Sequence, residues 1–385
     1  FLALLSFPFF AKGETPYTTV DIFPAGNKHT HSSSIVQCPN GDLLACWYHG
    51  SGERTADDVV VQGARLKKGA KHWGPVFEMA DTPDFPDCNP ILHIDPEDRL
   101  RLFWVSVLAN RWECSLLKVK LAEDFQGQGP PIWSWQDIVP LKPGPKFAQT
   151  MKQRFEEIKL NTAMWAEYAR PYEDLLLKAA LDPFKRQTGW MPRTKPLNLP
   201  NGRILLPLYS DGFNVSLIAI SDDNGDTWRT SQPIIGLGPI QPSLARRRDG
   251  TIIAFCRDSG PPPGRVMTSF SHDNGETWNA AQDTALPNPG SSLDVIVLQD
   301  GQWLIVYNDS NKSRDNLTVA ISMDEGKTWP LKSRLEPQED GATSFSYPSV
   351  IQSANGTVHI SYTCKGARGS RIRHGILQPT QIKAQ

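Results

Sequence analysis

The chain has 385 residues, with 40 Lys and Arg against 41 Asp and Glu and a formal net charge of −1. This balance excludes a strong global field, so neither nucleic acid nor an anionic membrane is expected as the partner. Twelve Trp and 32 Pro suit a loop-rich all-β protein, and six Cys are too few for a disulfide framework. Cys46, Cys256 and Cys364 fall in or beside apolar runs, where we expect buried thiols.

The first residues are almost entirely apolar. We interpret residues 1–15 as the remnant of a secretory signal, with an ordinary N-terminal strand as the alternative. The apolar run of residues 1–11 is too short to span a bilayer, which needs about 20 residues. We therefore expect no membrane span, a secreted, periplasmic or extracellular location, and one domain over residues 16–385.

A turn signal followed by an apolar or alternating run occurs six times. The second turn residues are Gly41, Asp98, Gly202, Gly250, Gly301 and Gly356. Asn-Gly and Asp-Gly pairs are strong signals of two-residue hairpins, and the flanking segments have the composition of strands. Each signal therefore predicts a β-hairpin. Successive turns lie about 50 residues apart, except that the second and third are about 100 residues apart.

The long step contains an insertion over about residues 145–190. Within it, residues 153–160 and 172–180 have the apolar spacing and the good helix formers of α-helices. We predict a helical insertion between two repeats. A lid or rim over a pocket and a packing decoration remain equal alternatives.

One octapeptide pattern, S-x-D-x-G-x-T-W, recurs at residues 221–228, 271–278 and 322–329. Its tryptophans are about 50 residues apart, which marks a repeat architecture. Asp can bond its own backbone, Gly accepts positive φ, and Trp can pack beneath the turn. We interpret the box as structural. Six hairpins at this period predict an all-β, six-bladed β-propeller, because a β-sandwich would not explain the repeat.

The residue nine positions before each turn reference should begin the innermost strand. These residues are polar or amphipathic: Ser32, Asn89, Arg193, Gln241, Ser292 and Tyr347. Two positions further on the same strand face come Lys195 and Asp294. A polar site at the mouth of the channel is one interpretation, and mutual satisfaction of these groups with water is the other.

With this repeat, the chain resembles the sialidase (neuraminidase) superfamily, whose Asp boxes have this octapeptide pattern. The resemblance covers nearly the whole chain except the insertion. It implies a six-bladed propeller in which three arginines bind a substrate carboxylate, a Glu activates a Tyr nucleophile, and an Asp is the acid/base. Tyr347 keeps the family spacing to the next turn, and Arg257 and Arg314 match the second and third arginines.

Two positions depart from the family pattern. His31, with His29 beside it, stands where the first arginine is expected, and Gln241 replaces the glutamate. Gln cannot accept a proton, whereas His titrates near neutral pH and could act as the base. The acid/base loop is expected within residues 53–58, which offers Asp57 or Asp58.

The leading functional hypothesis is a sialidase-like glycoside hydrolase acting on an acidic oligosaccharide or glycoconjugate. Tyr347, His31 and Asp57 or Asp58 would be catalytic. The substrate would be bound by Arg257, Arg314, Gln241, Arg193, Lys195, Asn89, Asp294 and His29. A polysaccharide lyase acting on uronate glycans and a non-catalytic glycan-binding propeller are the alternatives. No metal or cofactor is expected, because no ligand motif or oxygen cluster is present in the sequence, and the oligomeric state is open.

Overall fold

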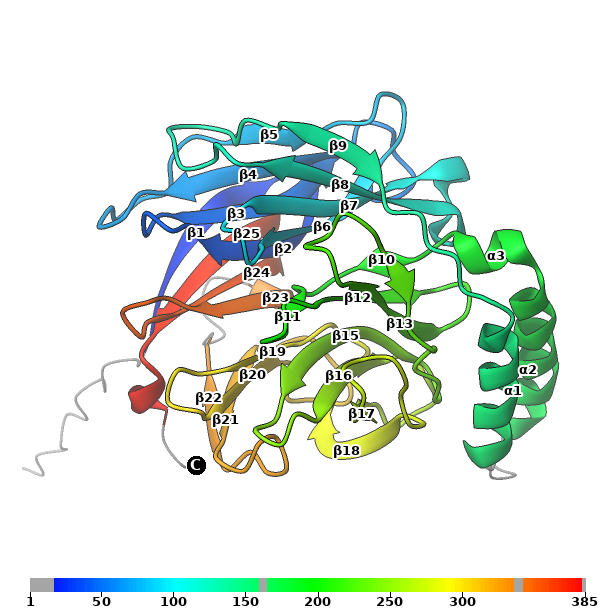
Figure 1. The fold of residues 1–385 in the computed structure, drawn as a ribbon. Coiled ribbons are helices and arrows are strands. Elements are labelled where there is room, and N and C mark those ends of the chain that lie inside the picture. The colour runs from blue at the N-terminus through cyan, green and yellow to red at the C-terminus, as the bar shows by residue number, and fades with distance from the viewer. Residues whose placement is uncertain (1–16, 159–164, 336–341, 383–385) are drawn as a thin grey trace, which may run out of the picture.

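The fold is a six-bladed β-propeller (Figure 1). The computed structural model describes residues 17–158, 165–335 and 342–382, so the predicted signal remnant at 1–15 lies outside the described residues. The inner strands of neighbouring blades contact one another in turn around the axis. The prediction of the fold class is confirmed.

Each blade is an antiparallel sheet. From the axis outward, blade 1 contains β2 (His29–Gln37), β3 (Leu43–Gly50), β4 (Val60–Leu66) and β5 (Phe77–Ala80). Blade 2 contains β6 (Asp87–Ile94), β7 (Leu100–Val107), β8 (Ser115–Ala122) and β9 (Trp135–Ile138). Blade 3 contains β10 (Met191–Pro192) and β11 (Leu197–Asn198), both paired with β12 (Ile204–Ser210), then β13 (Val215–Ser221) and β14 (Arg229–Thr230).

The other three blades repeat this order. Blade 4 contains β15 (Pro239–Arg246), β16 (Ile252–Asp258), β17 (Arg265–Ser271) and β18 (Gln282–Pro287). Blade 5 contains β19 (Asp294–Val297), β20 (Trp303–Tyr307), β21 (Thr318–Ser322) and β22 (Leu331–Arg334). Blade 6 contains β23 (Ala342–Gln352), β24 (Val358–Gly366) and β25 (Gly369–Leu377), and its outermost strand is β1 (Tyr17–Gly26). The ring therefore closes by pairing the first described strand with the last.

All six predicted hairpins form, but their loops have three residues rather than two. In the first, the Gly41 N–H donates to the Cys38 carbonyl (2.8 Å) and the Cys38 N–H donates to the Asp42 carbonyl (2.8 Å). The same pair of bonds recurs in the other five hairpins. Gly41 has a φ of 89°. A tight turn followed by one left-handed residue explains why Gly occupies five of these positions; Asp98, with a φ of 58°, occupies the sixth.

The three Asp boxes are hydrogen-bonded turns between the third and fourth strands of blades 3, 4 and 5. In the last box, Asp324 accepts bonds from the Thr328 N–H (2.8 Å) and hydroxyl (2.7 Å), and Ser322 Oγ accepts from the Gly326 N–H (2.9 Å). The Trp278 indole donates to the Gly275 carbonyl at 3.1 Å and is buried. These contacts bear out the structural interpretation of the box.

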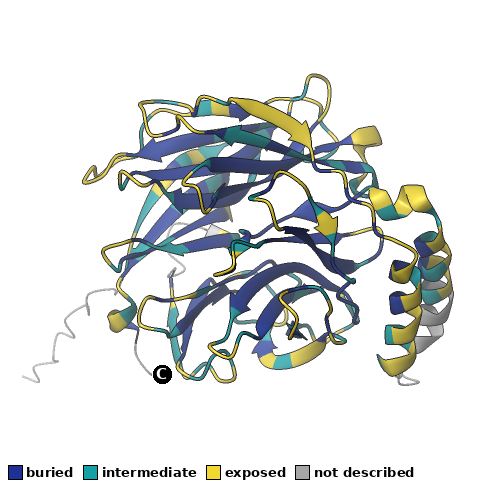
Figure 2. Ribbon diagram, in the orientation of Figure 1, coloured by how far each residue is buried: buried dark blue, intermediate teal, exposed yellow. Residues whose placement is uncertain are grey.

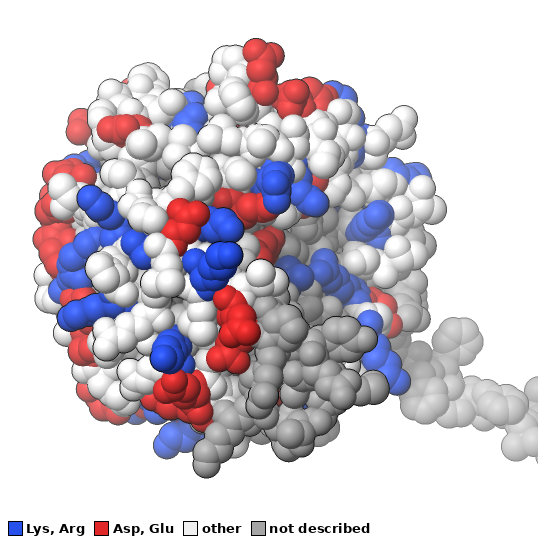
Figure 3. All heavy atoms as spheres, turned by 90° about the vertical axis from the view of Figure 1, so that its right-hand side faces the viewer, with Lys and Arg blue, Asp and Glu red and all other residues white. Residues whose placement is uncertain are grey.

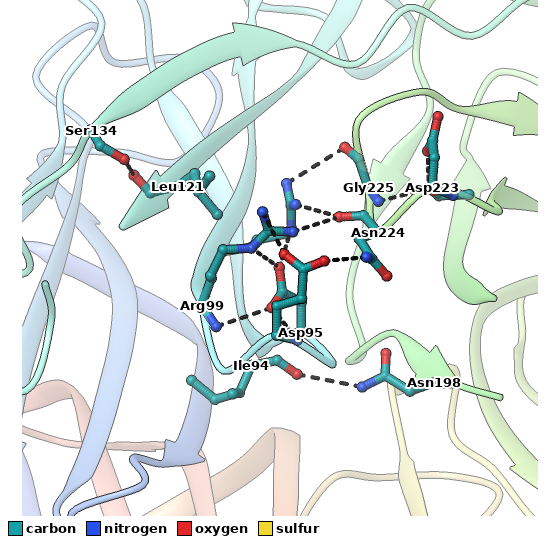
Figure 4. Close-up of polar contacts among 12 residues, drawn as sticks. Ile94, Asp95, Arg99, Leu121, Ser134, Asn198, Asp223, Asn224 and Gly225 are labelled. Atoms are coloured by element: carbon teal, nitrogen blue, oxygen red, sulfur yellow. Dashed lines mark hydrogen bonds and ion pairs between the residues drawn. The ribbon is translucent and has the colours of Figure 1, made fainter. Parts of the chain in front are cut away.

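Arginines of the preceding blade donate hydrogen bonds to the Asp boxes of blades 3 and 4. Figure 4 shows Arg99 and Asp95, from the β6–β7 hairpin, facing Asn224 in the box of blade 3. Arg99 donates to the Asn224 carbonyl at 3.2 Å, and the buried Arg101 guanidinium donates to the same oxygen while pairing with Asp95 at 3.1 Å. Arg203 makes an equivalent bond to the box of blade 4. The boxes therefore join neighbouring blades.

Apolar side chains fill the spaces between adjacent blades. Leu205 and Ala254 share one cluster between blades 3 and 4, and Phe255 and Trp303 share another between blades 4 and 5. All six cysteines are free, and the expectation that Cys46, Cys256 and Cys364 are buried is confirmed. The burial colouring of Figure 2 shows this core along the strands.

A pair of histidines, the half-buried His359 and the buried His374, links β24 and β25. The Trp73 indole donates to His374 Nδ1 (3.3 Å), so the His374 proton is on Nε2 and is donated to His359 Nδ1 (2.9 Å). The remaining His359 nitrogen donates to Ser353 Oγ (3.2 Å). Burial lowers the pKa of His359 to about 4 and the pKa of His374 to about 3. Both imidazoles are therefore neutral near pH 7.

The predicted helical insertion is present. It comprises α1 (Lys146–Ile158), α2 (Trp165–Leu181) and α3 (Pro183–Gln187), which lie together on one side of the propeller (Figure 1). Phe147 of α1 packs edge-on against Trp190 and Phe213 of blade 3, with ring centroids 5.9 and 5.2 Å apart. The outer sides of the helices are exposed (Figure 2). Among the described helices, none is long and apolar enough to cross a membrane.

Candidate active site

Four inner strands carry a β-bulge at the same position. On β2, for example, His31 and Ser34 pair with Tyr48 and Cys46, so the inner strand has one extra residue. The same irregularity occurs on β6, β15 and β23. The bulged residues have positive φ angles between 51° and 57°: Ser32, Asn89, Gln241 and Tyr347. Left-handed backbone at a non-glycine residue costs about 1–3 kcal/mol and is typical of functional sites.

Three of these bulged side chains line a polar cavity of about 430 Å³ at the channel mouth. The cavity is lined by His31, Glu53, Asn89, Trp112, Tyr209, Asp211, Asn214, Ile240, Gln241, Arg257, Ser259, Arg314 and Tyr347. Its volume lies within the range of small-molecule sites, about 300–1,000 Å³. The structure thus brings together six predicted site residues: His31, Asn89, Gln241, Arg257, Arg314 and Tyr347.

The Tyr347 hydroxyl is surrounded by nitrogen donors. Its oxygen accepts from Arg257 Nη1 at 3.0 Å and from Gln241 Nε2 at 3.1 Å. Arg257 Nη1 also lies 3.4 Å from Gln241 Oε1, which is consistent with the amide nitrogen facing Tyr347. Both neighbours can stabilise negative charge that develops on the phenol oxygen.

The arginines of the site keep unpaired charge. Arg314 donates to the Gly290 carbonyl at 2.6 Å, and its guanidinium lies 5.9 Å from the centroid of the Tyr347 ring. Among the residues that the structure describes, no carboxylate lies within ion-pair distance of Arg257 or Arg314. Their forked donors are therefore available to a carboxylate on a ligand.

His31 lies against Tyr347, with ring centroids 4.2 Å apart. Its Nδ1 is 2.9 Å from the Thr363 hydroxyl. Burial, together with the positive charge of the neighbouring arginines, holds the pKa of His31 well below its ordinary value. His29 stacks on Tyr48 at 5.6 Å and contacts the edge of His31 at 5.8 Å. His31 is thus a neutral imidazole at the cavity wall, and His29 lies behind it.

Two carboxylates reach the cavity: Glu53 and Asp211. Glu53 accepts a hydrogen bond from the hydroxyl of the buried Tyr48. Asp211 is exposed on one side, yet burial by the surrounding protein raises its pKa against the opposing effect of Arg257. Glu53 is therefore a carboxyl group held in one orientation at the edge of the site.

Asp57 and Asp58, the predicted acid/base candidates, are not among the described residues that line the cavity. Asp58 forms an ion pair with Lys28 at 2.8 Å and accepts bonds from Ser51, which lower its pKa. Glu53 precedes them in the same loop and faces the cavity instead. Of the three carboxylates in this loop, Glu53 is therefore the one that lines the cavity.

Three other predicted substrate contacts lie deeper. Arg193 is buried beneath Tyr347, 4.7 Å from the ring centroid, and donates to the Pro348 carbonyl at 3.0 Å. Lys195 and Asp294 pair with each other at 2.6 Å. Two residues along a strand is about 6.6 Å, so a position two residues beyond the rim lies well inside the channel. The Lys195–Asp294 pair therefore lies in the core of the propeller near its axis.

The second strands contribute residues that the sequence analysis missed. They lie seven positions after a turn reference, the same offset as the predicted Arg257: Tyr48, Tyr209 and Thr363. Tyr209 accepts from Asn89 at 3.1 Å. Counting forward from each turn, as well as backward, would have found them. Trp112 comes from a short 3-10 helix between β7 and β8, where no repeat signal exists.

The insertion contributes no described residue to the lining of this cavity. It borders the site indirectly, because the Thr188 hydroxyl donates to the Glu113 carbonyl at 3.1 Å and the Gly189 N–H donates to the Ser115 carbonyl at 2.9 Å. These bonds fix the segment that carries Trp112. The face that Figure 3 turns toward the viewer mixes basic and acidic side chains over its described part.

Comparisons with known proteins agree with this fold. Residues 182–360 match the BNR repeat-like domain. The sialidase of Micromonospora viridifaciens is 28% identical over 152 residues, which cover 37% of this chain and 22% of that protein. The sialidase of Bacteroides fragilis is 24% identical over 199 residues, which cover 49% of this chain and 35% of that protein. The chain thus matches only about a third or less of the length of these relatives.

Solved structures match over nearly the whole chain. A protein of unknown function from Dyadobacter fermentans has a TM-score of 0.68 at 17% identity, covering 94% of this chain and 97% of its own. A Hadza microbial sialidase has a TM-score of 0.69 at 16% identity, covering 95% and 69%. The chain contains BNR repeats, is distantly homologous to sialidases, and shares their propeller fold.

Proposed function

We propose that this chain is a glycoside hydrolase that binds an acidic sugar through Arg257 and Arg314 and cleaves the glycosidic bond beside it. One observation carries the proposal: two arginines without a carboxylate partner among the described residues converge with the Tyr347 hydroxyl in one polar cavity. The distant homology to sialidases supports the same substrate class.

The chemistry is assigned by position. Tyr347 oxygen attacks the anomeric carbon, and Glu53 donates a proton to the leaving oxygen, so the glycosidic bond breaks as the tyrosyl bond forms. Arg257 and the Gln241 amide stabilise the phenol oxygen, because both donate hydrogen bonds to it. Gln241 cannot accept the phenol proton. That proton passes to the neutral imidazole of His31, directly or through one water. Glu53 then removes a proton from the water that attacks the anomeric carbon, the tyrosyl bond breaks, and the Tyr347 oxygen regains its proton from His31.

A lyase is the second candidate, and the contact of His31 with Tyr347 at a site without the family glutamate favours it. In that reaction a base removes the proton beside a uronate carboxylate and the glycosidic oxygen leaves. The products decide between the two reactions, because elimination creates an unsaturated sugar that absorbs in the near ultraviolet.

The test is a product assay of purified protein on sialosides, uronate oligosaccharides and neutral glycans. For a hydrolase, we expect Glu53→Gln and Tyr347→Phe to lower kcat by about 10²–10⁴-fold on an acidic substrate. Asp57→Asn is the matched control, since it changes a carboxyl group in the same loop outside the cavity lining. Loss of activity in Asp57→Asn with full activity in Glu53→Gln would refute the acid assignment. Binding of acidic glycans without any product would leave a glycan-binding propeller.

A further inference from the structure

A second cavity of about 330 Å³ lies beside the site, between the insertion and the rim of blades 2 and 3. It is lined by residues of the α2–α3 region, including Phe184, Lys185 and Thr188, and by Arg111 and Glu113. None of these residues lines the first cavity. The helical insertion thus builds a pocket of its own next to the candidate active site.

One wall separates the two cavities. Along residues 111–114, Trp112 lines the first cavity while Glu113 lines the second. Along residues 209–214, Asp211 lines the first cavity while Gly212 lines the second. The two segments touch, because a Cβ on Gly212 would lie 3.1 Å from Glu113 Cβ. The partition is therefore about one residue thick.

The lining of the second cavity suits a sugar. Phe184 is 65% exposed, although aromatic side chains usually bury most of their surface. The backbone that carries this ring is fixed at the start of α3, because Asp182 accepts from the Phe184 N–H at 2.9 Å. Lys185 supplies a cation, and among the described residues it has no ion-pair partner. An aromatic face beside a few polar groups is the usual composition of a small-molecule pocket.

We infer that the second cavity is a subsite for a further sugar of the same glycan, on the far side of Trp112 from the bond that is cleaved. This inference rests on the proposed function, because it takes the first cavity to hold the acidic sugar. It predicts a preference for oligosaccharides over isolated acidic sugars or short aryl glycosides.

Calorimetry with two pairs of probes tests the subsite without requiring cleavage. The pairs are free sialic acid with sialyllactose, and a free uronic acid with a uronate trisaccharide. In the Glu53→Gln background, used for every titration so that cleavage is slowed, we expect at least one trisaccharide to bind about tenfold more tightly than its monosaccharide. Phe184→Ala should remove most of this gain and leave monosaccharide affinity unchanged. Leu175→Ala is the matched control, since Leu175 is 64% exposed on α2 and is not in the cavity lining.

The outcomes separate the subsite from the proposed function. Equal affinity for both members of each pair, no binding at all, or an unchanged gain in Phe184→Ala would overturn the subsite. A gain that depends on Phe184, without product from any glycan, would support the subsite and refute the hydrolase. A second variant, Lys185→Met, removes the charge and keeps most of the side-chain length. It should weaken the uronate trisaccharide more than sialyllactose, whose other two sugars are neutral.

Discussion

Replacement of Lys195 by Met tests whether the axial ion pair holds the blades together or binds substrate. Lys195 Nζ lies 2.6 Å from Asp294, and the two side chains are 16% and 3% exposed. Asp294 also accepts from the Ser243 hydroxyl and the Val350 N–H, each at 2.8 Å. These contacts come from blades 3 to 6. Lys195→Met fills similar space but leaves the carboxylate without its counter-charge.

We expect this variant to lose about 3 kcal/mol of unfolding free energy. Breaking a buried pair by removing one partner costs about 3–5 kcal/mol, and the remaining hydrogen bonds with slight access of water at Lys195 favour the lower end. With an unfolding entropy of about 2 cal/mol/K per residue, the melting temperature of a chain of this length falls by about 4 °C.

The assay is urea unfolding of the wild type, Lys195→Met, Asp294→Asn and the double variant. We expect the double variant to lose less unfolding free energy than the two single variants lose together. The reason is that Asp294→Asn removes the negative charge that would need Lys195 as its partner. Below the unfolding transition, Lys195→Met should bind acidic glycans as the wild type does. Unchanged stability together with lost binding would show that the pair is a substrate contact, and the structural argument would be wrong.

Three further outcomes are expected. Arg314→Ala should weaken binding of an acidic glycan by about 30-fold or more, since truncating one partner of a buried charge pair costs about 2–5 kcal/mol; equal affinity in titration calorimetry would remove Arg314 from the carboxylate contact. Gly225→Ala should destabilise the protein in thermal unfolding by at least about 1 kcal/mol more than Gly202→Ala. Their φ angles are 86° and 85°, but only at Gly225 would the new Cβ meet another side chain, 2.8 Å from Arg101 Cζ; equal losses would contradict the close packing of this Asp box. Stability should also fall as pH drops from about 6.5 toward 4, because the pKa of His359 is lowered from 6.5 to about 4 and the unfolded chain then binds more protons than the folded one. In His359→Gln, urea unfolding at pH 7 and pH 5 should show a smaller difference than in the wild type, and an unchanged difference would exclude this histidine as a cause.

The repeat made the fold predictable. Six turns and three Asp boxes at one period located every blade, because each Gly or Asp at the turn has the left-handed backbone that the hairpin requires. The turn pairs alone did not distinguish two-residue from three-residue loops, since Asn-Gly and Asp-Gly fit both. For the insertion, apolar spacing predicted helices but not the part of the propeller that they cover.

The site was predictable only where it follows the repeat. Asn89, Gln241 and Tyr347 were found because they share one position before a turn, and the structure places them on equivalent bulges. Glu53 lies in a loop without a period, so its approach to the cavity depends on the hydrogen bond from Tyr48 and not on any spacing. Lys195 was grouped with the site because strand alternation gives the face of a residue but not its depth along the axis.

Closure of the ring by β1 and β25 also determines when the cavity can exist. His31 lies on β2, whereas its neighbours Tyr347 and Thr363 lie on β23 and β24. During synthesis, His31 can meet Thr363 only after more than 300 further residues have left the ribosome. Pairings of such long range form slowly. Any activity of this cavity therefore begins only with the fully translated propeller, and an interrupted chain would be inert however many blades it had completed.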